Sequence, residues 1–419
     1  MPKERAKDGR LNRRAFITSA SGLAVASAGS LSSPFISSAR AQEPAKVGLV
    51  FAKQGTWTEQ GEHLVNGAKV ALEQVGSKVL GRPVEFVWLD EPNPQVAQQN
   101  MQKMVDEMKV SAVIGGTNSG TSLAMASVAK RSKMPFIAAN AAARDITGKE
   151  CNRYTFRTLA TTPVACRAVA PHLASIGKNW YFLVASYVFG LDVYKSMKAE
   201  LDAVGGKEVG FDETPLGTTD FSSFILKIRQ AKPDVVVLAI QGNDLSNFLK
   251  QYKEFGLQDK IPVCNPVIGD SDLWSIGAET SFGIYGKPWH FSDPSNPPAD
   301  KEFAAAYSKA HGRPASDKAW LGWQSMRMLI GAIQKEQSFE PEKIVAGLET
   351  LQVRDGEALT YYRDWDHQLL HRYLVLRVKK KITDKWDYLE LLGQSPANPG
   401  DLDTLFGSKA EVGCTLGSL

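Results

Sequence analysis

The sequence lacks the signatures of the common enzyme classes. It contains no Gly-x-Ser-x-Gly elbow, no His-Glu-x-x-His helix, and no Ser-x-x-Lys accompanied by the companion motifs of that class. A glycine-rich stretch at residues 115–121 has the glycine spacing of a phosphate loop but no lysine, which excludes a nucleoside triphosphate site of that type. We therefore expect a protein that is not an enzyme and that holds no cofactor and no metal.

Cysteine is scarce, and the four that occur are widely spaced. Cys151, Cys166, Cys264 and Cys414 fit no zinc-binding pattern, and four cysteines allow three disulfide pairings among which the sequence does not decide. The surroundings favour Cys151 with Cys414, because both lie in polar, loop-like segments. Cys166 lies in an apolar helical stretch and Cys264 follows a short predicted strand, so both are expected to be buried thiols.

The chain of 419 residues also carries little excess charge. Lys and Arg number 49 against 45 Asp and Glu, which gives a net charge of +4. Residues 1–41 hold seven of the basic residues and only two acidic ones, so the rest of the chain is nearly neutral. This excludes the basic surface that is typical of proteins that bind nucleic acid or anionic membranes.

Residues 1–41 have the composition of an export signal. Paired arginines, Arg13 and Arg14, precede a weakly apolar stretch at 15–36, and Ala39-Arg40-Ala41 is a small-x-small cleavage pattern. The stretch is too rich in Ser and Gly for a spanning helix, which needs about 20 strongly apolar residues. We expect export to the periplasm, and the paired arginines resemble a twin-arginine signal.

From residue 46 onward, strand-like runs alternate with amphipathic helical stretches. The first half of the pattern predicts strands at 46–51, 84–89, 112–114 and 135–138, with helices at 61–75, 94–108 and 121–131. After a break at 140–160 the pattern repeats, with strands at 180–184, 208–211, 235–239 and 261–263 and helices at 191–204, 222–232 and 243–255. Helices at 298–311, 317–335 and 341–350 and strands at 372–378 and 386–391 follow. The fold class is therefore α/β, with parallel sheets in two lobes and a cleft between them.

Residues that directly follow the predicted strands are the candidates for a ligand site, because ligands of open α/β sheets bind beyond the carboxyl ends of the strands. The turn at 115–121 aims backbone N–H groups and a helix N-terminus at that region, which suits a carboxylate. An equally good interpretation is a plain turn whose polar residues only cap the helix. Trp57, Tyr187 and Phe189 also follow predicted strands.

The order and spacing of several short motifs resemble the substrate-binding proteins of ABC importers, specifically the branched-chain amino-acid-binding (type I periplasmic binding protein) family. The resemblance covers most of residues 45–390. The motifs that carry it are Lys46-Val-Gly-Leu-Val, the glycines from Gly55 to Gly67, Val113-Ile-Gly115, Met134-Pro-Phe-Ile137, Tyr154-Thr-Phe-Arg157, Tyr187-Val-Phe-Gly190, Asp220-Phe-Ser-Ser, Lys232-Pro-Asp-Val-Val and Asp366-His-Gln368.

The resemblance implies two Rossmann-like lobes joined by a three-stranded hinge. Lobe 1 would comprise residues 45–157 and 289–365, and lobe 2 would comprise 158–288 and 366–390, followed by a tail at 391–419. In this family, loops after strands of both lobes hold the ligand. The ligand-binding residues that the resemblance implies are Trp57, Gln60, Asn118, Ser119, Gly120, Asn140, Ala141, Ala142, Tyr187, Phe189, Gln241, Gly269 and Asp270.

Two departures from the family pattern disfavour an α-amino acid as ligand. Ala142 stands where members that bind amino acids tend to have Thr, and Pro266 stands where some have a Glu for the ammonium group. Asp270 is left as the one candidate partner for an ammonium group. A buried ammonium without a partner would cost several kcal/mol, so an aromatic or other bulky carboxylate or amide becomes a serious candidate.

The function that fits best is capture of a small organic solute and its delivery to an inner-membrane ABC permease with its ATPase subunits. We expect a monomer. Two alternatives remain open: a sensor subunit that binds ligand and docks on a receptor, and an exported hydrolase that uses Asp270 or Asp366 as an acid or base.

Overall fold

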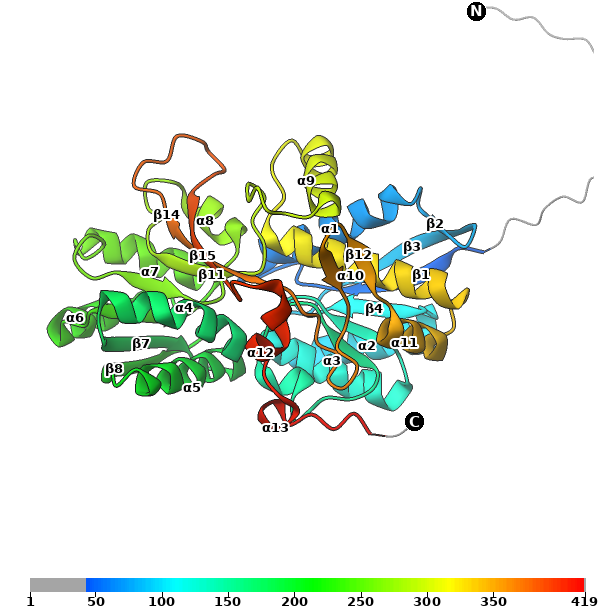
Figure 1. Ribbon diagram of the computed structural model, residues 1–419, viewed down its shortest axis with the longest axis horizontal. Helices are drawn as coiled ribbons and strands as arrows, with labels where there is room; N and C mark the ends of the chain where they lie inside the picture. The colour runs from blue at the N-terminus through cyan, green and yellow to red at the C-terminus, as the bar shows by residue number, and fades with distance from the viewer. Residues whose placement is uncertain (1–42, 418–419) are drawn as a thin grey trace, which may run out of the picture. The chain divides into compact units, whose positions relative to one another are not determined.

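The computed structural model describes residues 43–417, so the predicted export signal lies outside the described residues. Within this range the long strands form two sheets, one of six strands and one of seven, and a short two-stranded sheet stands apart from them (Figure 1). No helix within residues 43–417 combines the length and apolar character that a membrane span requires.

The six-stranded sheet has the order β2-β3-β1-β4-β5-β6, and all its pairs except β2–β3 are parallel. Its central strands β1, β4 and β5 are almost wholly apolar and buried, as expected for parallel strands covered on both faces. Its strands are β1 (Ala45–Val50), β2 (Lys78–Val79), β3 (Arg82–Leu89), β4 (Ala112–Gly115), β5 (Phe136–Ala138) and β6 (Thr155–Arg157).

Helices from two distant parts of the chain belong to this half. The early ones are α1 (Thr58–Gln74), α2 (Pro94–Lys103) and α3 (Ser119–Ser132), and the late ones are α9 (Pro298–His311), α10 (Asp317–Glu336) and α11 (Pro341–Thr350). Of the late helices, α10 lies against the sheet, while α9 packs on α1 and α10, and α11 packs on α10. The backbones of α1 and α10 touch, because a Cβ on Gly67 would lie 1.8 Å from the carbonyl oxygen of Ala319. This close packing brings the segment after residue 297 back to the first sheet.

The seven-stranded sheet has the order β15-β14-β11-β10-β9-β7-β8, in which β14 and β15 are antiparallel additions to a parallel core. Its strands are β7 (Asn179–Ala185), β8 (Lys207–Thr214), β9 (Val235–Ala239), β10 (Val263–Asn265), β11 (Ile284–Lys287), β14 (Tyr373–Val378) and β15 (Leu389–Ser395). The helices of this half are α4 (Thr162–Ile176), α5 (Val188–Ala203), α6 (Ser222–Ala231), α7 (Gly242–Glu254) and α8 (Asp270–Ile276). The short sheet pairs β12 (Val353–Asp355) with β13 (Ala358–Thr360).

Within residues 43–417 the chain passes between the two large sheets three times: after β6, after β11 and before β14. The first and third passages lie side by side, because Arg157 and Gln368 form a parallel bridge. The guanidinium of Arg157, fully buried, donates to Gln368 Oε1 at 2.7 Å and to the carbonyl oxygen of Ala143 at 2.6 Å. Burial lowers the pKa of Arg157 to about 10, so the group stays charged and these bonds hold the passage together.

The C-terminal segment lies against both halves through named contacts. Arg167 on α4 donates to the carbonyl oxygen of Leu405 in α12 (Leu402–Phe406) at 3.0 Å. Beyond the short helix α13 (Lys409–Val412), Cys414 forms a disulfide with Cys151, with their Cα atoms 5.7 Å apart. Cys166 and Cys264 are free and buried.

The predicted α/β class with two lobes is confirmed, but five short strands, β2, β6, β11, β12 and β13, were not predicted, and β6 and β11 belong to the two large sheets beside the site. Strand β6 lies inside the segment expected to be a break, and β11 lies in a stretch to which no strand was assigned. Both are short, and β11 ends in a lysine, so neither has the apolar run that marks a buried strand. The strand expected at 261–263 instead occupies Val263–Asn265. The predicted helix at 94–108 continues past α2 as a π-helical turn at Met104–Met108.

Candidate ligand-binding site

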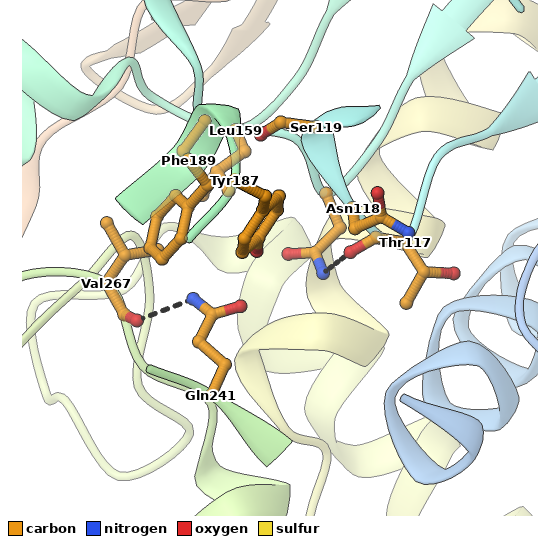
Figure 2. Close-up of a pocket in the computed structure, with 10 residues that line it drawn as sticks. Thr117, Asn118, Ser119, Leu159, Tyr187, Phe189, Gln241 and Val267 are labelled. Carbon is orange, nitrogen blue, oxygen red and sulfur yellow. Dashed lines mark hydrogen bonds between the residues drawn. The ribbon is translucent and has the colours of Figure 1, made fainter. Parts of the chain in front are cut away.

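A pocket lies where strand ends of the two large sheets face each other (Figure 2). As the two walls stand, its cavity volume is about 10 Å³, close to the space that one water molecule needs. A small metabolite therefore fits only when the two walls move apart. The lining residues are Thr117, Asn118, Ser119, Asn140, Ala142, Leu159, Tyr187, Phe189, Gln241 and Val267.

The wall from the six-stranded sheet is polar, and the turn between β4 and α3 forms much of it. Asn118 caps α3, since its Oδ1 accepts from the Thr121 N–H at 3.1 Å. Ser119 Oγ accepts from the backbone N–H of Ala143 at 3.1 Å, which ties the β4 turn to the loop after β5. The positive end of a 14-residue helix thus lies at the pocket, where it favours an anionic group.

Asn140 is the other polar group of this wall. Its Nδ2 donates to the carbonyl oxygen of Thr117 at 3.0 Å and to Gln60 Oε1 at 3.2 Å. Its Oδ1 is buried, and no donor among residues 43–417 reaches it. One acceptor at the pocket is therefore left without a partner from the described chain.

The wall from the seven-stranded sheet is largely aromatic. The rings of Tyr187 and Phe189 lie 5.9 Å apart between their centroids, and Trp57 from the other half lies 6.3 Å from Tyr187. Burial raises the pKa of Tyr187 well above its usual value, with a smaller effect from Asp244, so its hydroxyl stays neutral. Figure 2 shows the rings of Tyr187 and Phe189 opposite Asn118 and Thr117. On the same side as the rings, Gln241 donates to the carbonyl oxygen of Val267 at 2.8 Å.

Behind the polar wall lies a buried acid, Glu91. Its Oε1 accepts the backbone N–H of Thr117. Burial raises the pKa of Glu91 to about 8, against the lowering effect of hydrogen bonds from Thr117 and Thr121, so the carboxyl is protonated at neutral pH. The polar wall is therefore not backed by a negative charge under these conditions.

Near the pocket the two halves touch. Gly242 begins α7 with a φ of +57°, and a Cβ there would lie 2.5 Å from the carbonyl oxygen of Thr56. Gln60 on α1 donates to Asp272 Oδ1 on α8 at 3.0 Å. Arg144 in turn forms an ion pair with Asp192 on α5. Through these contacts the two sides of the cleft touch each other beside the pocket.

Among the residues expected to bind ligand, the pocket brings together seven and leaves six outside its lining. The seven are Asn118, Ser119, Asn140, Ala142, Tyr187, Phe189 and Gln241, and the six are Trp57, Gln60, Gly120, Ala141, Gly269 and Asp270. Trp57 and Gln60 contact lining residues, as described above. Gly120 is the second residue of α3, and Ala141 is buried between Asn140 and Ala142.

Asp270 is engaged elsewhere. Its carboxylate pairs with buried Lys287, and His290 Nδ1 lies 3.6 Å from the same oxygen. Burial alone would raise the pKa of Asp270, but these two neighbours outweigh it and hold the pKa below its usual value. Gly269 donates its backbone N–H to Asp272 Oδ2 at 3.1 Å. Asp366, the other acid considered for hydrolysis, pairs with Arg363 at 2.6 Å.

Three lining residues were not anticipated: Thr117, Leu159 and Val267. Thr117 lies within the glycine-rich turn at 115–121, so the predicted place of that turn beside the ligand is the signal that points to it. Leu159 follows β6, which was missed, and Val267 follows β10, which was placed two residues early. In both cases the error in the strand carried over to the site.

Comparison with known proteins agrees with this fold. The sequence profile of the periplasmic binding protein family matches residues 44–383, most of the chain. The chain belongs to this family. The predicted resemblance to the branched-chain amino-acid-binding proteins of ABC importers is thereby confirmed.

Three proteins show how far the similarity of this chain to known proteins extends. A Leu/Ile/Val-binding protein homologue of Brucella melitensis is 24% identical over 339 residues, which cover 76% of this chain and 83% of the relative. A periplasmic binding protein of Burkholderia mallei has a TM-score of 0.82 and 27% identity, over 90% of this chain and all of that one. A solute-binding protein of an ABC transporter from Rhodopseudomonas palustris, solved with p-hydroxybenzoic acid, has a TM-score of 0.77 at 23% identity, over 85% of this chain and 98% of that one. The last likeness shows the fold alone.

Proposed function

We propose that this chain captures a small organic carboxylate between its two lobes and delivers it to an ABC permease. One observation carries the proposal: the pocket has a helix N-terminus and amide groups on one wall, aromatic rings on the other, and no charged residue among its ten lining side chains. Such a pocket orients an acid through its carboxylate and buries the rest against apolar surface.

The carboxylate belongs at the polar wall. The first N–H groups of a helix have no acceptor within the helix, and the helix dipole favours an anion there. Asn118 and Ser119 start α3 at this place. Glu91 stays neutral at pH 7, so it does not oppose the anion from behind.

An aromatic or bulky acid fits the pocket better than an α-amino acid. An α-ammonium group would be buried without a carboxylate partner, at a cost of several kcal/mol. Asp270 does not supply that partner, because Lys287 already neutralises it. A relative of this chain is named for Leu, Ile and Val, and a structure of the same fold holds p-hydroxybenzoic acid, so the fold accommodates both ligand classes.

The rest of the assignment rests on the sequence and on the family. The leader at residues 1–41 would direct export by the twin-arginine route, and the body would act in the periplasm as a monomer beside permease and ATPase subunits. The lobes would divide at 157/158, 288/289 and 365/366. The predicted tail boundary at 391 falls inside β15.

A ligand screen of the chain from Gln42 onward tests the proposal. Benzoate and p-hydroxybenzoate should raise the melting temperature and bind with a stoichiometry of one in titration calorimetry, whereas leucine and phenylalanine should bind at least tenfold more weakly. The ligand should be recovered unchanged after incubation. Tighter binding of the amino acids, or turnover of the ligand, would contradict the proposal.

A further inference from the structure

Four polar groups connect the pocket to the opposite lobe through one buried series of hydrogen bonds. Asp272 on α8 accepts from Gln60 Nε2 at 3.0 Å, Gln60 Oε1 accepts from Asn140 Nδ2 at 3.2 Å, and the same Nδ2 donates to the carbonyl oxygen of Thr117 at 3.0 Å. The side chains of Gln60, Asp272 and Asn140 are all 5% exposed or less. Water therefore does not compete for these groups.

The donor-to-acceptor direction of every hydrogen bond in this series is fixed by the groups at its two ends. An ionised carboxylate can only accept, so Gln60 must turn its amide nitrogen toward Asp272 and its oxygen toward Asn140. Burial raises the pKa of Asp272 to about 6 against the lowering effects of Lys318 and Gln60, so the group is ionised at pH 7.5. The backbone N–H of Gly269, 3.1 Å from Asp272 Oδ2, also donates to it.

At the pocket end, the carbonyl oxygen of Thr117 imposes the same orientation on Asn140. Turning the amide over would set two acceptor oxygens against each other, once at Thr117 and once at Gln60. Both N–H bonds of Asn140 are thus used, and its Oδ1 remains. That oxygen is buried on a lining residue and receives no donor from residues 43–417. A buried acceptor left without a donor is unfavourable.

From this arrangement we propose that Asn140 Oδ1 selects the ligand by requiring a hydrogen-bond donor, and that Gln60 and Asp272 are positioning residues that fix its orientation. The inference rests on the proposed function and narrows its ligand class. Because no lining side chain is charged, the donor that fits is a hydroxyl group and not an ammonium group. The expected ligand is a carboxylic acid that carries a hydroxyl group.

The test compares acids that differ by one hydroxyl, measured by titration calorimetry at pH 7.5. The aromatic set is benzoate with its 2-, 3- and 4-hydroxy derivatives, and the aliphatic set is 4-methylpentanoate with its 2-hydroxy derivative. In the set that binds, we expect the hydroxylated acid whose hydroxyl reaches Asn140 to bind about 5- to 150-fold tighter than its parent, the range that follows from pairing a buried acceptor.

Variants of Asn140 and Asp272 test which residues cause the preference for the hydroxylated acid. Asn140→Leu keeps the approximate size of the side chain but removes both Oδ1 and the Nδ2 that donates to Thr117 and Gln60, so every acid should bind more weakly and the preference for a hydroxylated acid should vanish. Asn140→Ala serves where the leucine is not accommodated. Asp272→Asn can donate to Gln60 and so removes the constraint at one end of the series, which leaves only the Thr117 carbonyl to orient Asn140 and should reduce the preference at least threefold. Asp300→Asn is the matched control, because Asp300 is also buried, with a pKa raised by burial to about 6, yet does not line the pocket.

The outcomes separate the two proposals. If neither set binds, the proposed function fails and this inference fails with it. If parent acids bind and no hydroxylated acid exceeds its parent, or if Asn140→Leu keeps the preference, only the inference is overturned. An equal change of preference in Asp300→Asn and Asp272→Asn would also overturn the positioning role, since a general loss of stability would then explain both.

Discussion

The two walls of the pocket are built from the same kind of strand–turn–helix unit, but one wall is polar and the other is largely aromatic. On the six-stranded side the turns present amide, hydroxyl and helix N–H groups from Thr117, Asn118, Ser119 and Asn140. On the seven-stranded side the corresponding turns present mainly the rings of Tyr187 and Phe189. Both sets of residues follow the carboxyl ends of parallel strands, so the topology sets where they lie and the side chains set what each wall recognises.

This division has an energetic consequence. Apolar contact contributes free energy in proportion to area and hardly depends on orientation, whereas a hydrogen bond or a helix N-terminus depends on position and polarity. We therefore expect the aromatic wall to set much of the affinity and the polar wall to set the discrimination between ligands. Three experiments test this comparison.

The largest effect should come from ionisation of Glu91, which places a negative charge behind the polar wall. Its pKa, raised by burial to about 8 from 4.5, means that folding takes up a proton between these values, so its stabilising contribution is full below pH 4.5 and is lost as pH rises to 8. Glu91→Gln keeps the neutral shape. The free energy of unfolding of the variant minus that of the wild type should rise by roughly 3–5 kcal/mol between pH 4.5 and 9.

Urea unfolding at several pH values measures this difference directly. Binding should follow the same titration: the wild type should lose affinity for a carboxylate above pH 8 but keep its affinity for the matching amide, and Glu91→Gln should keep both. Parallel stability curves for the two proteins would show that Glu91 is ionised over this pH range, which would place a negative charge behind the polar wall at neutral pH.

The second effect should come from holding the walls apart. A Cβ on residue 242 would lie 2.5 Å from the carbonyl oxygen of Thr56, and the φ of +57° adds strain for any residue other than glycine. Overpacking of this kind costs about 1–3 kcal/mol, so Gly242→Val should weaken binding on the order of 100-fold for every ligand, whatever its polarity.

Gly256→Ala is the matched control for Gly242. It has a similar φ of +67° with open space around the missing Cβ, so it carries the backbone strain without the contact. It should leave ligand affinity unchanged in calorimetry. A Gly242 variant that binds as tightly as Gly256→Ala would mean that the walls need not meet at this point for ligand to bind.

Much of this architecture could be predicted because parallel strands buried on both faces leave a plain mark in the sequence. The run Val235–Ala239 is apolar throughout and could be assigned without its neighbours. Strand β11 could not, because its Lys287 is a charged residue whose burial depends on Asp270, a partner that no local pattern reveals. The same holds for Thr155–Arg157, where Arg157 is buried by contacts with Gln368 far along the chain.

The site shows the same limit at the level of single atoms. That Asn140 would lie near the ligand followed from the family resemblance. The orientation of its amide did not, since Gln60, Thr117 and Asp272 fix it from three separate elements. A resemblance carries over positions along the chain, and hydrogen-bond polarity is a property of the assembled network. Thus the sequence could suggest which residues surround the pocket, whereas the orientation of the Asn140 amide depends on the folded structure.

The smallest effect separates the two walls most sharply. Tyr187→Ala removes apolar contact and should weaken the binding of benzoate and of benzamide alike, by roughly 10- to 50-fold, because burial of a ring does not depend on the charge of the ligand.

Ser119→Ala leaves the Ala143 N–H without its acceptor and loosens the turn at the N-terminus of α3. It should weaken benzoate about tenfold and benzamide about threefold, so that the ratio of the two affinities changes. Calorimetry measures the affinity of each of the two ligands for each of the two variants. If Tyr187→Ala shifts that ratio and Ser119→Ala does not, the assignment of discrimination to the polar wall is wrong, and the ring hydroxyl of Tyr187 becomes the group that recognises the carboxylate.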